Sequence, residues 1–218
     1  MWSWFRKAEP VHQQIRQYET GLPDKRARAR DCSYLVLDFE TTGLDPGKHH
    51  IVSAGWVCIE QQRILLSSAQ YHLVRAPVSV GQSAVIHGLH NPQLQSGTEL
   101  HELLELLLQQ AQGKVLVSHH SGLELNFLRQ ACLYCYGRPA RFRMLDTLKL
   151  ELFRLQLQGR LVAQDKLTLA ACLERHQLPA ISEHQALSDA FGCAQLFLTQ
   201  LQQRDSGTSL ADLLSQSR

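Results

Sequence analysis

The stretch that decides the fold is Tyr34-Leu35-Val36-Leu37-Asp38-Phe39-Glu40-Thr41-Thr42-Gly43. Its apolar first half predicts a buried strand, which ends in two carboxylates and a glycine turn. Asp38 and Glu40 are two residues apart, so in a regular strand both side chains leave the same face. One divalent cation could partner both acids. The alternative is a strand that simply ends in a polar turn, and these two acids alone do not decide between the interpretations.

The composition is that of a soluble globular protein. Of the 218 residues, 44% are hydrophobic and 19% are charged. This length suits one domain with terminal tails. The net charge of +2 neither demonstrates nor opposes a polyanionic partner. No apolar run reaches the roughly 18 to 20 residues of a membrane span, and the first residues lack a signal peptide's apolar segment. We therefore expect a cytoplasmic protein with no membrane partner.

The six cysteines are scattered through expected strands and helices. They lack the dense spacing of a disulfide framework, so we expect reduced thiols. Cys132 and Cys135 form a C-x-x-C pair, but no second pair completes a zinc site. We interpret these two cysteines as structural.

The order of the expected elements predicts an α/β fold. After the opening strand, residues 51–59 and 64–74 are expected to be strands that extend an antiparallel meander. A leucine-rich helix capped by Thr98 then precedes an apolar strand at 114–118, so that strand is expected to run parallel. The later elements are expected to be a helix at 123–133, a brief strand at 143–146, a helix at 147–153, a helix at 168–176 and a long helix from Ser182 or Glu183 to Gln202.

Three regions are expected along the chain: an N-terminal extension at 1–32, a folded domain at 33–204 and a tail at 205–218. The extension contains Lys25-Arg26-Ala27-Arg28-Ala29-Arg30, which is either a phosphate-facing patch or a solvated surface segment. The tail contains Ser209-Leu210-Ala211-Asp212-Leu213-Leu214. This segment is either a short partner-binding helix or, as is more usual for so short a tail, a frayed end.

Acids and histidines fall in three motifs at the ends of separate elements. These are Asp38-Phe39-Glu40-Thr41-Thr42-Gly43, His119-His120-Ser121-Gly122-Leu123-Glu124, and His184-Gln185-Ala186-Leu187-Ser188-Asp189-Ala190, with Ile86-His87-Gly88 in a loop between the first two. Their order and spacing resemble those of the DEDDh exonucleases, the family of the proofreading epsilon subunit of the bacterial replicative polymerase. The resemblance covers about residues 33 to 203.

This resemblance implies a ribonuclease H-like fold, with a mixed five-stranded sheet flanked by helices, and a metal-dependent 3′–5′ exonuclease activity. It implies two divalent ions, Mg²⁺ or Mn²⁺, with Asp38 bridging both, Glu40 and Asp189 completing one site, and Glu124 supporting the other. His184 is the implied general base that deprotonates the attacking water. The region at 33–204 would then be the exonuclease domain.

The resemblance also implies how substrate binds. Thr41, Thr42 and Gly43 would cradle the terminal nucleotide, Ile86 and His87 would touch the last base, and His120 is a further substrate contact. The expected substrate is a single-stranded or frayed DNA 3′ end, cleaved to nucleoside 5′-monophosphates in proofreading or repair. RNA trimming stays open as an alternative, and a DNA polymerase subunit is a candidate partner.

The second motif departs from the family pattern at two positions. The family has aspartate where this chain has Glu124, and asparagine where it has His120. Glutamate reaches about 1.5 Å further, which could alter the metal spacing, favour Mn²⁺ or slow the reaction. A nucleic-acid-binding adaptor with weak or no catalysis is therefore a second hypothesis. Asp146 is a candidate substitute acid, but we interpret it as a helix cap beside Thr147.

Overall fold

The computed structural model describes residues 12–76, 95–182 and 184–217. Its helices are α1 (Gln13–Gly21), α4 (Leu100–Gln110), α5 (Gly122–Tyr136), α6 (Thr147–Leu157), α7 (Leu169–Arg175), α8 (Ala186–Gln202) and α9 (Leu210–Gln216), with short 3-10 turns η1 (Ala29–Asp31) and η2 (Gln164–Leu167). Its strands are β1 (Ser33–Thr41), β2 (Ile51–Glu60), β3 (Arg63–Leu73), β4 (Lys114–Ser118) and β5 (Met144–Asp146). Among the described helices, none is both long and apolar enough to cross a bilayer.

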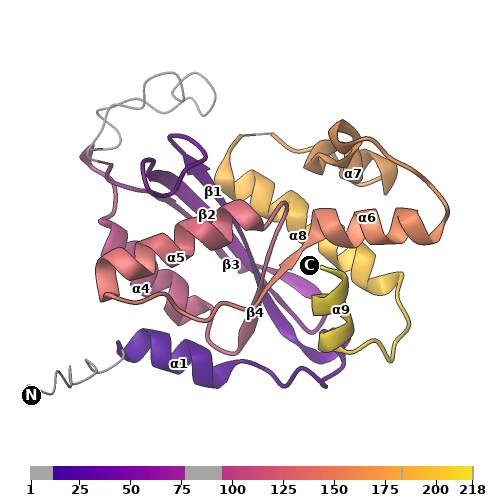
Figure 1. Ribbon diagram of the computed structural model, residues 1–218, viewed down its shortest axis with the longest axis horizontal. Coiled ribbons are helices and arrows are strands. Elements are labelled where there is room, and N and C mark those ends of the chain that lie inside the picture. Colours follow the sequence, from indigo (N-terminus) through magenta and orange to yellow (C-terminus); the bar gives the residue numbers. More distant parts are fainter. Residues whose placement is uncertain (1–11, 77–94, 183, 218) are drawn as a thin grey trace, which may run out of the picture.

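The strands form one mixed sheet with β1 at its centre. The order is β3-β2-β1-β4-β5, in which β1, β2 and β3 pair antiparallel while β4 runs parallel to both β1 and β5. The expected meander and the expected parallel strands are therefore confirmed. Figure 1 shows α4 and α5 on one side of this sheet and α8 on the other. The carboxyl end of β1 thus lies between helices from two different parts of the chain.

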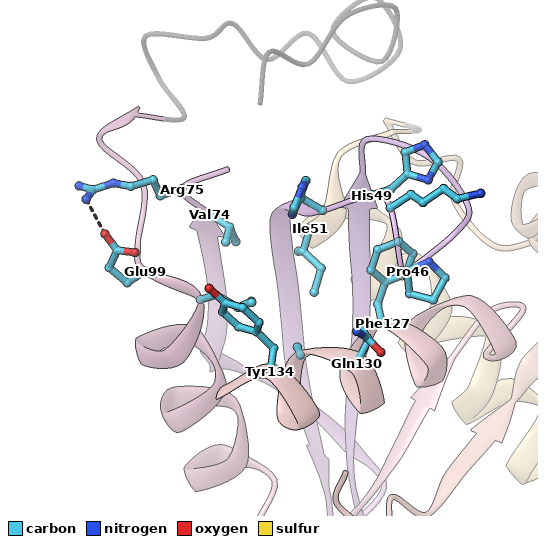
Figure 2. A pocket seen from close by; sticks show the side chains of 14 residues that line it. Pro46, His49, Ile51, Val74, Arg75, Glu99, Phe127, Gln130 and Tyr134 are labelled. Carbon is cyan, nitrogen blue, oxygen red and sulfur yellow. Dashed lines mark hydrogen bonds and ion pairs between the residues drawn. The ribbon is translucent and has the colours of Figure 1, made fainter. Parts of the chain in front are cut away.

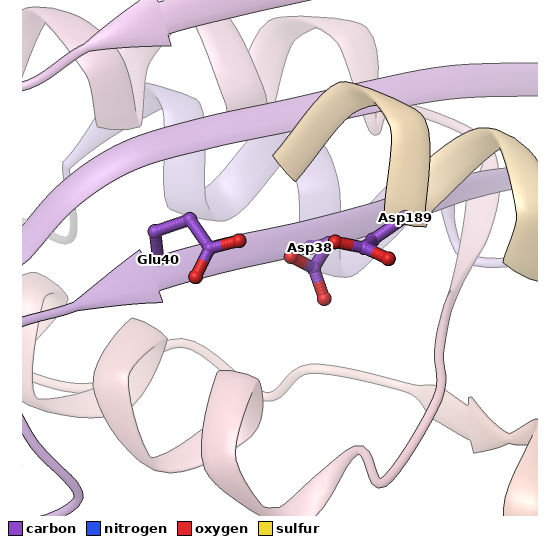
Figure 3. A group of neighbouring side chains, drawn as sticks. All are labelled: Asp38, Glu40 and Asp189. Atoms are coloured by element: carbon purple, nitrogen blue, oxygen red, sulfur yellow. The ribbon is translucent and has the colours of Figure 1, made fainter. Parts of the chain in front are cut away.

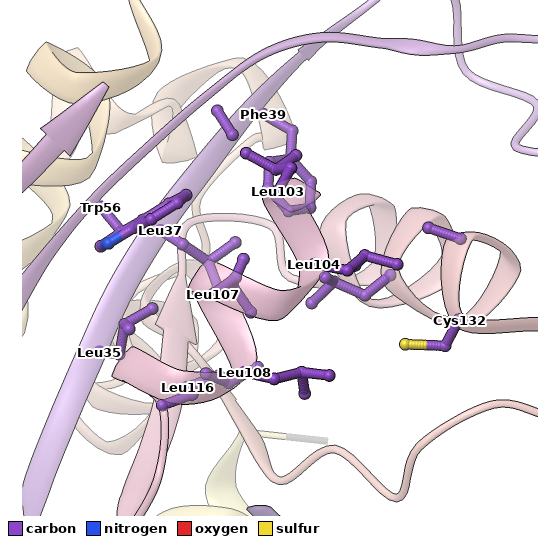
Figure 4. Close-up of a cluster of buried hydrophobic side chains, with 14 of the residues drawn as sticks. Leu35, Leu37, Phe39, Trp56, Leu103, Leu104, Leu107, Leu108, Leu116 and Cys132 are labelled. Carbon is purple, nitrogen blue, oxygen red and sulfur yellow. The ribbon is translucent and has the colours of Figure 1, made fainter. Parts of the chain in front are cut away.

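Alternate residues of β1 enter two separate cores. Leu35, Leu37 and Phe39 pack with the leucines of α4 in one core (Figure 4). Tyr34 and Val36 pack in the other core with residues of α8. Because strand side chains alternate with a period of two, Asp38 and Glu40 continue the second set and face α8. The apolar pattern of β1 therefore determines which helix the acids meet.

The two chain ends fold against these cores. Ile15 and Tyr18 of α1 are fully buried in the first core, and Leu210 and Leu213 of α9 are fully buried in the second. Ser209 and Asp212 form a capping box at the start of α9, which satisfies backbone N–H groups at that end. The expectation of a frayed tail was wrong, because its leucines have a buried surface to cover.

Two of the four basic side chains in the segment between α1 and β1 are bonded within the protein. Arg30 donates hydrogen bonds to the carbonyl oxygens of Gln202 and Arg204 at 2.9 and 2.8 Å. Arg28 pairs with Asp31 at 2.7 Å and also forms a β-bridge with Ser209. This segment therefore joins the C-terminal residues to the sheet through Arg28 and Arg30, while the charges of Lys25 and Arg26 remain available for a phosphate.

Two expected helix starts differ from the structure. The last helix begins at Ala186, not at Ser182 or at Glu183, which lies outside the described residues. His184 has a φ of 64°, a left-handed backbone that a right-handed helix cannot contain. Thr98 does not cap α4, because its backbone pairs instead with the end of β3 through Leu73 and Arg75. The local pattern was therefore overridden at Thr98 by a long-range backbone pairing, and at the last helix by the left-handed backbone of His184.

A buried carboxylate joins α6 to α7. Glu151 is fully buried and binds Arg154, Arg175 and His176 at 2.6, 3.1 and 2.9 Å. Burial alone would raise the pKa of Glu151, but hydrogen bonds from His176 and Arg154 outweigh it and hold the pKa well below its usual range. This network fixes α7, which precedes the segment that carries His184.

Candidate active site

Three carboxylates meet where β1 ends beside the first turn of α8. Carboxylate oxygens of Asp38, Glu40 and Asp189 all lie within 4.8 Å of one another (Figure 3). Glu40 is 7% exposed and the other two are half-buried. Asp189 is far from the other two acids along the chain, so the fold itself brings together three of the acids that the motifs singled out.

Gly55 decides how closely α8 approaches these acids. It lies opposite Asp38 in the ladder between β1 and β2. A Cβ atom built on Gly55 would lie 2.2 Å from the backbone nitrogen of Leu187 and 2.4 Å from the carbonyl carbon of Ala186. The first turn of α8 therefore rests on bare strand backbone, which only glycine allows. The sequence reasoning missed this residue, whose signal was an isolated glycine in an apolar strand.

Replacing Gly55 should damage stability and activity together. In Gly55→Ala we expect the free energy of unfolding to fall by about 1 to 3 kcal/mol, because the new methyl group overlaps backbone atoms. We expect the nuclease activity implied by the motifs to fall roughly a hundred-fold, because α8 and Asp189 move away from Asp38. Urea denaturation and a hydrolysis assay measure the two effects.

The matched control is Gly207→Ala. A Cβ atom at Gly207 would meet only a side-chain oxygen of Asp205, at the ordinary distance of 3.5 Å. We expect this variant to stay within about 0.5 kcal/mol of the parent, with full activity. A soluble Gly55→Ala protein that is as active as the parent would contradict the positioning role of Gly55.

Glu124 faces the cluster from the first turn of α5. It is 3% exposed, and the hydroxyl group of Ser118 donates a hydrogen bond to its Oε2 atom at 3.3 Å. Among the described residues, the group of acids whose oxygens lie within 4.8 Å of one another does not include Glu124. Glu124 is nevertheless close enough to raise the pKa of Asp38. It is thus a neighbour of the three-acid cluster on the α5 side.

Burial and mutual repulsion raise the pKa values of these acids. Burial, followed by the charges of Glu124, Glu40 and Asp189, raises the pKa of Asp38 well above its usual range. Burial and the charge of Asp189 raise the pKa of Glu40 to about 7. The pKa of Glu124 rises to about 8, mainly through burial. The folded chain therefore holds these carboxylates where their negative charges oppose one another.

This donor set fits a divalent cation of the magnesium type. Carboxylate oxygens are the ligands that Mg²⁺ and Mn²⁺ prefer, and the cluster offers one oxygen from each of three residues. A bound cation would also compensate the repulsion that raises the pKa values of Asp38 and Glu40. The residues present are consistent with the metal that the motifs imply.

His184 lies in the segment that leads into α8, not on the helix itself. It is exposed, and its φ of 64° is a left-handed backbone conformation that is uncommon for a residue other than glycine. The next residue, Gln185, donates its backbone N–H group to Oδ2 of Asp189 at 3.1 Å. The side chain of Gln185 also caps α8 by accepting from the backbone of Ser188 at 2.8 Å. The segment bearing His184 is thus bonded directly to an acid of the cluster.

Asp146 holds the turn of the second motif. It is fully buried and accepts hydrogen bonds from the backbone N–H groups of His120 at 2.9 Å and Ser121 at 3.0 Å. It also accepts from Leu148 at 3.0 Å, so its expected role as the cap of α6 is confirmed. His120 has a φ of 67°, and Asp146 supports this unusual conformation. Asp146 reaches the turn at His120 and Ser121 because β5 pairs in parallel with β4. This contact between distant segments is not apparent from the sequence alone.

The turn expected to cradle a nucleotide follows the cluster directly. Thr41 donates its hydroxyl group to the carbonyl oxygen of Gly43 at 2.8 Å, and Thr42 accepts from the backbone N–H group of His50 at 2.9 Å. The register between β1 and β2 shifts at Thr41, which bends the strand end. The turn is therefore held rigidly beside Glu40.

A cavity of about 440 Å³ lies beyond this turn (Figure 2). It is lined by residues 46–51, by Val74, Arg75, Glu99 and Leu100, and by Phe127 and Tyr134 of α5. Phe127 lies one helical turn after Glu124, so the cavity is next to the acids along α5. Ile86 and His87, which were expected to contact the last base, lie outside the described residues.

The sequence is similar to known nucleases. A family model described as Exonuclease, RNase_T, matches residues 35–197. The DNA polymerase III PolC-type protein of Thermotoga maritima is 30% identical over 170 residues, which are 77% of this chain and 12% of that protein. The 3′-5′ exonuclease DinG of Staphylococcus haemolyticus is 26% identical over 172 residues, which are 78% of this chain and 18% of that protein. The chain therefore spans less than a fifth of either relative.

Solved structures share the fold. Exonuclease X in complex with 5′ overhanging duplex DNA superposes with a TM-score of 0.65 at 18% identity, covering 85% of this chain and 99% of that one. The nuclease domain of 3′hExo, a DEDDh family member bound to rAMP, gives a TM-score of 0.65 at 16% identity, covering 81% and 94%. The expected ribonuclease H-like architecture is confirmed.

Proposed function

The chain belongs to the exonuclease family matched over residues 35–197, and from this premise we propose that it is a metal-dependent 3′–5′ exonuclease. Its proposed substrate is a single-stranded or frayed DNA 3′ end, cleaved to nucleoside 5′-monophosphates. The observation that carries the proposal is the convergence of Asp38, Glu40 and Asp189 to within 4.8 Å. This cluster has the ligand chemistry that in-line phosphodiester hydrolysis requires.

We assign the residues as follows. Asp38, Glu40 and Asp189 would hold one cation, and Glu124 with Asp38 would hold a second. When bound there, the cations would supply positive charge to stabilise the phosphoryl and leaving oxygens. His184 takes the proton from the attacking water, a step for which an exposed imidazole on the segment bonded to Asp189 is suited. The rigid turn at Thr41, Thr42 and Gly43, together with His120, orients the terminal nucleotide.

The test uses an oligonucleotide labelled at its 5′ end, incubated with Mg²⁺ or Mn²⁺. We expect a ladder of products shortened from the 3′ end, nucleoside 5′-monophosphates in the soluble fraction, and no products in EDTA. Matched DNA and RNA strands distinguish the DNA exonuclease from an RNA-trimming enzyme. A strand that is bound but never shortened would favour the adaptor, and products of mixed internal cleavage would contradict an exonuclease.

Glu124 is the position that tests the adaptor hypothesis. Because glutamate reaches about 1.5 Å further than aspartate, Glu124→Asp should restore the shorter ligand of the family pattern. We expect activity equal to the parent or several-fold higher in Mg²⁺, with a smaller preference for Mn²⁺. Initial rates with each metal measure the change. Glu105→Asp, at a partly exposed acid of α4, is the control.

A large loss of activity in Glu124→Asp would contradict this expectation. It would show that the hydrogen bond from Ser118 and the buried position of Glu124 are built around glutamate. A Glu124→Asp protein that gains activity from an inactive parent would instead establish that the parent is a binding adaptor.

Association with a DNA polymerase is a separate proposal about partners. It rests on the similarity to PolC-type proteins, of which this chain spans 12%. Co-purification of the tagged chain with a polymerase subunit tests it. Its failure would leave the proposed hydrolysis unaffected.

A further inference from the structure

A basic groove of about 980 Å³ lies between α5, the end of α1 and α9. The residues of α1 and α5 belong to the first core and those of α9 to the second, so the groove lies along the β5 edge of the sheet, where the two faces meet. Glu19 is the one acid among the described lining residues. Five basic residues line the groove, and they come from four separate parts of the chain: Lys25, Arg129, Arg141, Arg143 and Lys149.

Most of this positive charge is uncompensated. Glu19 is already engaged, because it pairs with Arg138 and accepts the backbone N–H group of Arg141, each at 2.8 Å. Within the described parts of the chain, four lining side chains make no ion pair and donate no hydrogen bond: Lys25, Arg129, Arg141 and Lys149. Like charges gathered in a concave surface attract a polyanion.

Apolar side chains also line the groove. They are Leu125, Phe142 and Met144. Phe142 is half-buried, and its ring contacts that of Tyr18 with centroids 5.4 Å apart. Arg143 donates a hydrogen bond to the carbonyl oxygen of Pro23, which fixes the wall formed by the segment after α1. Basic side chains together with an aromatic ring are the combination with which proteins hold single-stranded nucleic acid.

The groove begins at the second motif. Ser121 and Gly122 line it, and Glu124, two residues further on, faces the acid cluster. A Cβ atom built on Gly122 would have no atom within 4 Å, so the groove is open at this turn. A strand leaving the carboxylates past the start of α5 would enter the groove directly.

From these observations we infer that the groove binds the single-stranded part of the substrate upstream of the 3′ end. Lys25, Arg129, Arg141 and Lys149 contact its phosphates, and Phe142 offers a surface for its bases. The choice of nucleic acid over an acidic protein rests on the proposed exonuclease function. The charges of the groove themselves do not depend on it.

The test is the triple variant Arg129→Gln, Arg141→Gln and Lys149→Gln. In EDTA, where no hydrolysis occurs, we expect its affinity for a 20-nucleotide oligothymidylate to fall about ten-fold or more. The slope of log K against log salt should shrink by about 2, because three phosphate contacts are lost. With Mg²⁺, the KM for the oligonucleotide should rise with little change in kcat.

Two controls separate the groove from the catalytic site. The equal charge change Arg63→Gln, Arg160→Gln and Lys166→Gln is placed at exposed residues that do not line the groove, and it should leave affinity near that of the parent. The p-nitrophenyl ester of thymidine 5′-monophosphate is too small to reach the groove, so the triple groove variant should hydrolyse it at the parental rate. Failure of the parent to hydrolyse either substrate would count against the proposed function, while oligonucleotide binding in EDTA still tests the groove.

Unchanged affinity and unchanged salt dependence in the triple variant would overturn the inference. Lost binding of poly-glutamate with unchanged binding of the oligonucleotide would also overturn it, and would assign the groove to an acidic protein. If the triple variant loses hydrolysis of the small ester as well, the three single variants are measured instead. Parental affinity in all three would then refute the groove as a nucleic-acid site.

Discussion

Asp38→Asn is expected to abolish exonuclease activity while making the metal-free protein more stable. Asp38 is the acid that is proposed to take part in both cation sites. We therefore expect its replacement to lower kcat/KM roughly a thousand-fold or more. Burial and the charges of Glu124, Glu40 and Asp189 raise the pKa of Asp38. An amide at position 38 removes one charge from this group of mutually repelling acids. The electrostatic repulsion in the folded state is therefore smaller in Asp38→Asn than in the parent.

The sign of the stability change depends on pH. A carboxyl group whose pKa is raised by folding keeps its proton in the folded state after the unfolded chain has lost it, so it destabilises the folded protein increasingly as pH rises above the unfolded pKa. In EDTA, the gain in unfolding free energy for Asp38→Asn should therefore be larger at pH 8 than at pH 5. Denaturation at both pH values and the oligonucleotide assay measure the two halves of the prediction.

Asp205→Asn is the control, because Asp205 is exposed and lies near the chain end. It should change neither activity nor stability by a measurable amount. Parental activity in Asp38→Asn would refute the assigned site. Loss of activity together with lower stability at pH 8 would show that Asp38 is a structural acid and not a metal ligand.

His184→Ala is expected to lower kcat by about a hundred- to ten-thousand-fold, the range for loss of a general base. The segment bearing His184 is bonded to Asp189 through the backbone of Gln185, so we expect the cation affinity of the variant to change little. Added imidazole should restore part of the activity, because it can enter the exposed position that His184 occupies. A structural role would show no such rescue.

The control for this variant is His101→Ala, an exposed histidine of α4. We expect parental kcat for it, with or without imidazole. If His184→Ala keeps full activity, another group must take the proton from the attacking water. If it loses metal binding as well, the segment before α8 has a positioning role instead.

The helix and strand pattern came largely from local sequence. Alternation in β1 placed Asp38 and Glu40 on one face because strand side chains alternate with a period of two, and this holds wherever the strand lies. The meander and the parallel strands followed from the order of apolar runs. The starts of α4 and α8 were wrong, since a long-range backbone pairing displaced Thr98 and a left-handed backbone at His184 delayed α8.

The sequence by itself determined which residue types carry the chemistry, because motif order and spacing along the chain are sequence properties. Only the tertiary structure decided that Gly55 lets α8 bring Asp189 to Asp38 and that Asp146 supports His120. The same holds for the basic groove, whose charges come from four separate segments. Each of these depends on contacts between residues distant along the chain, which periodicity and propensity, as local properties, do not encode.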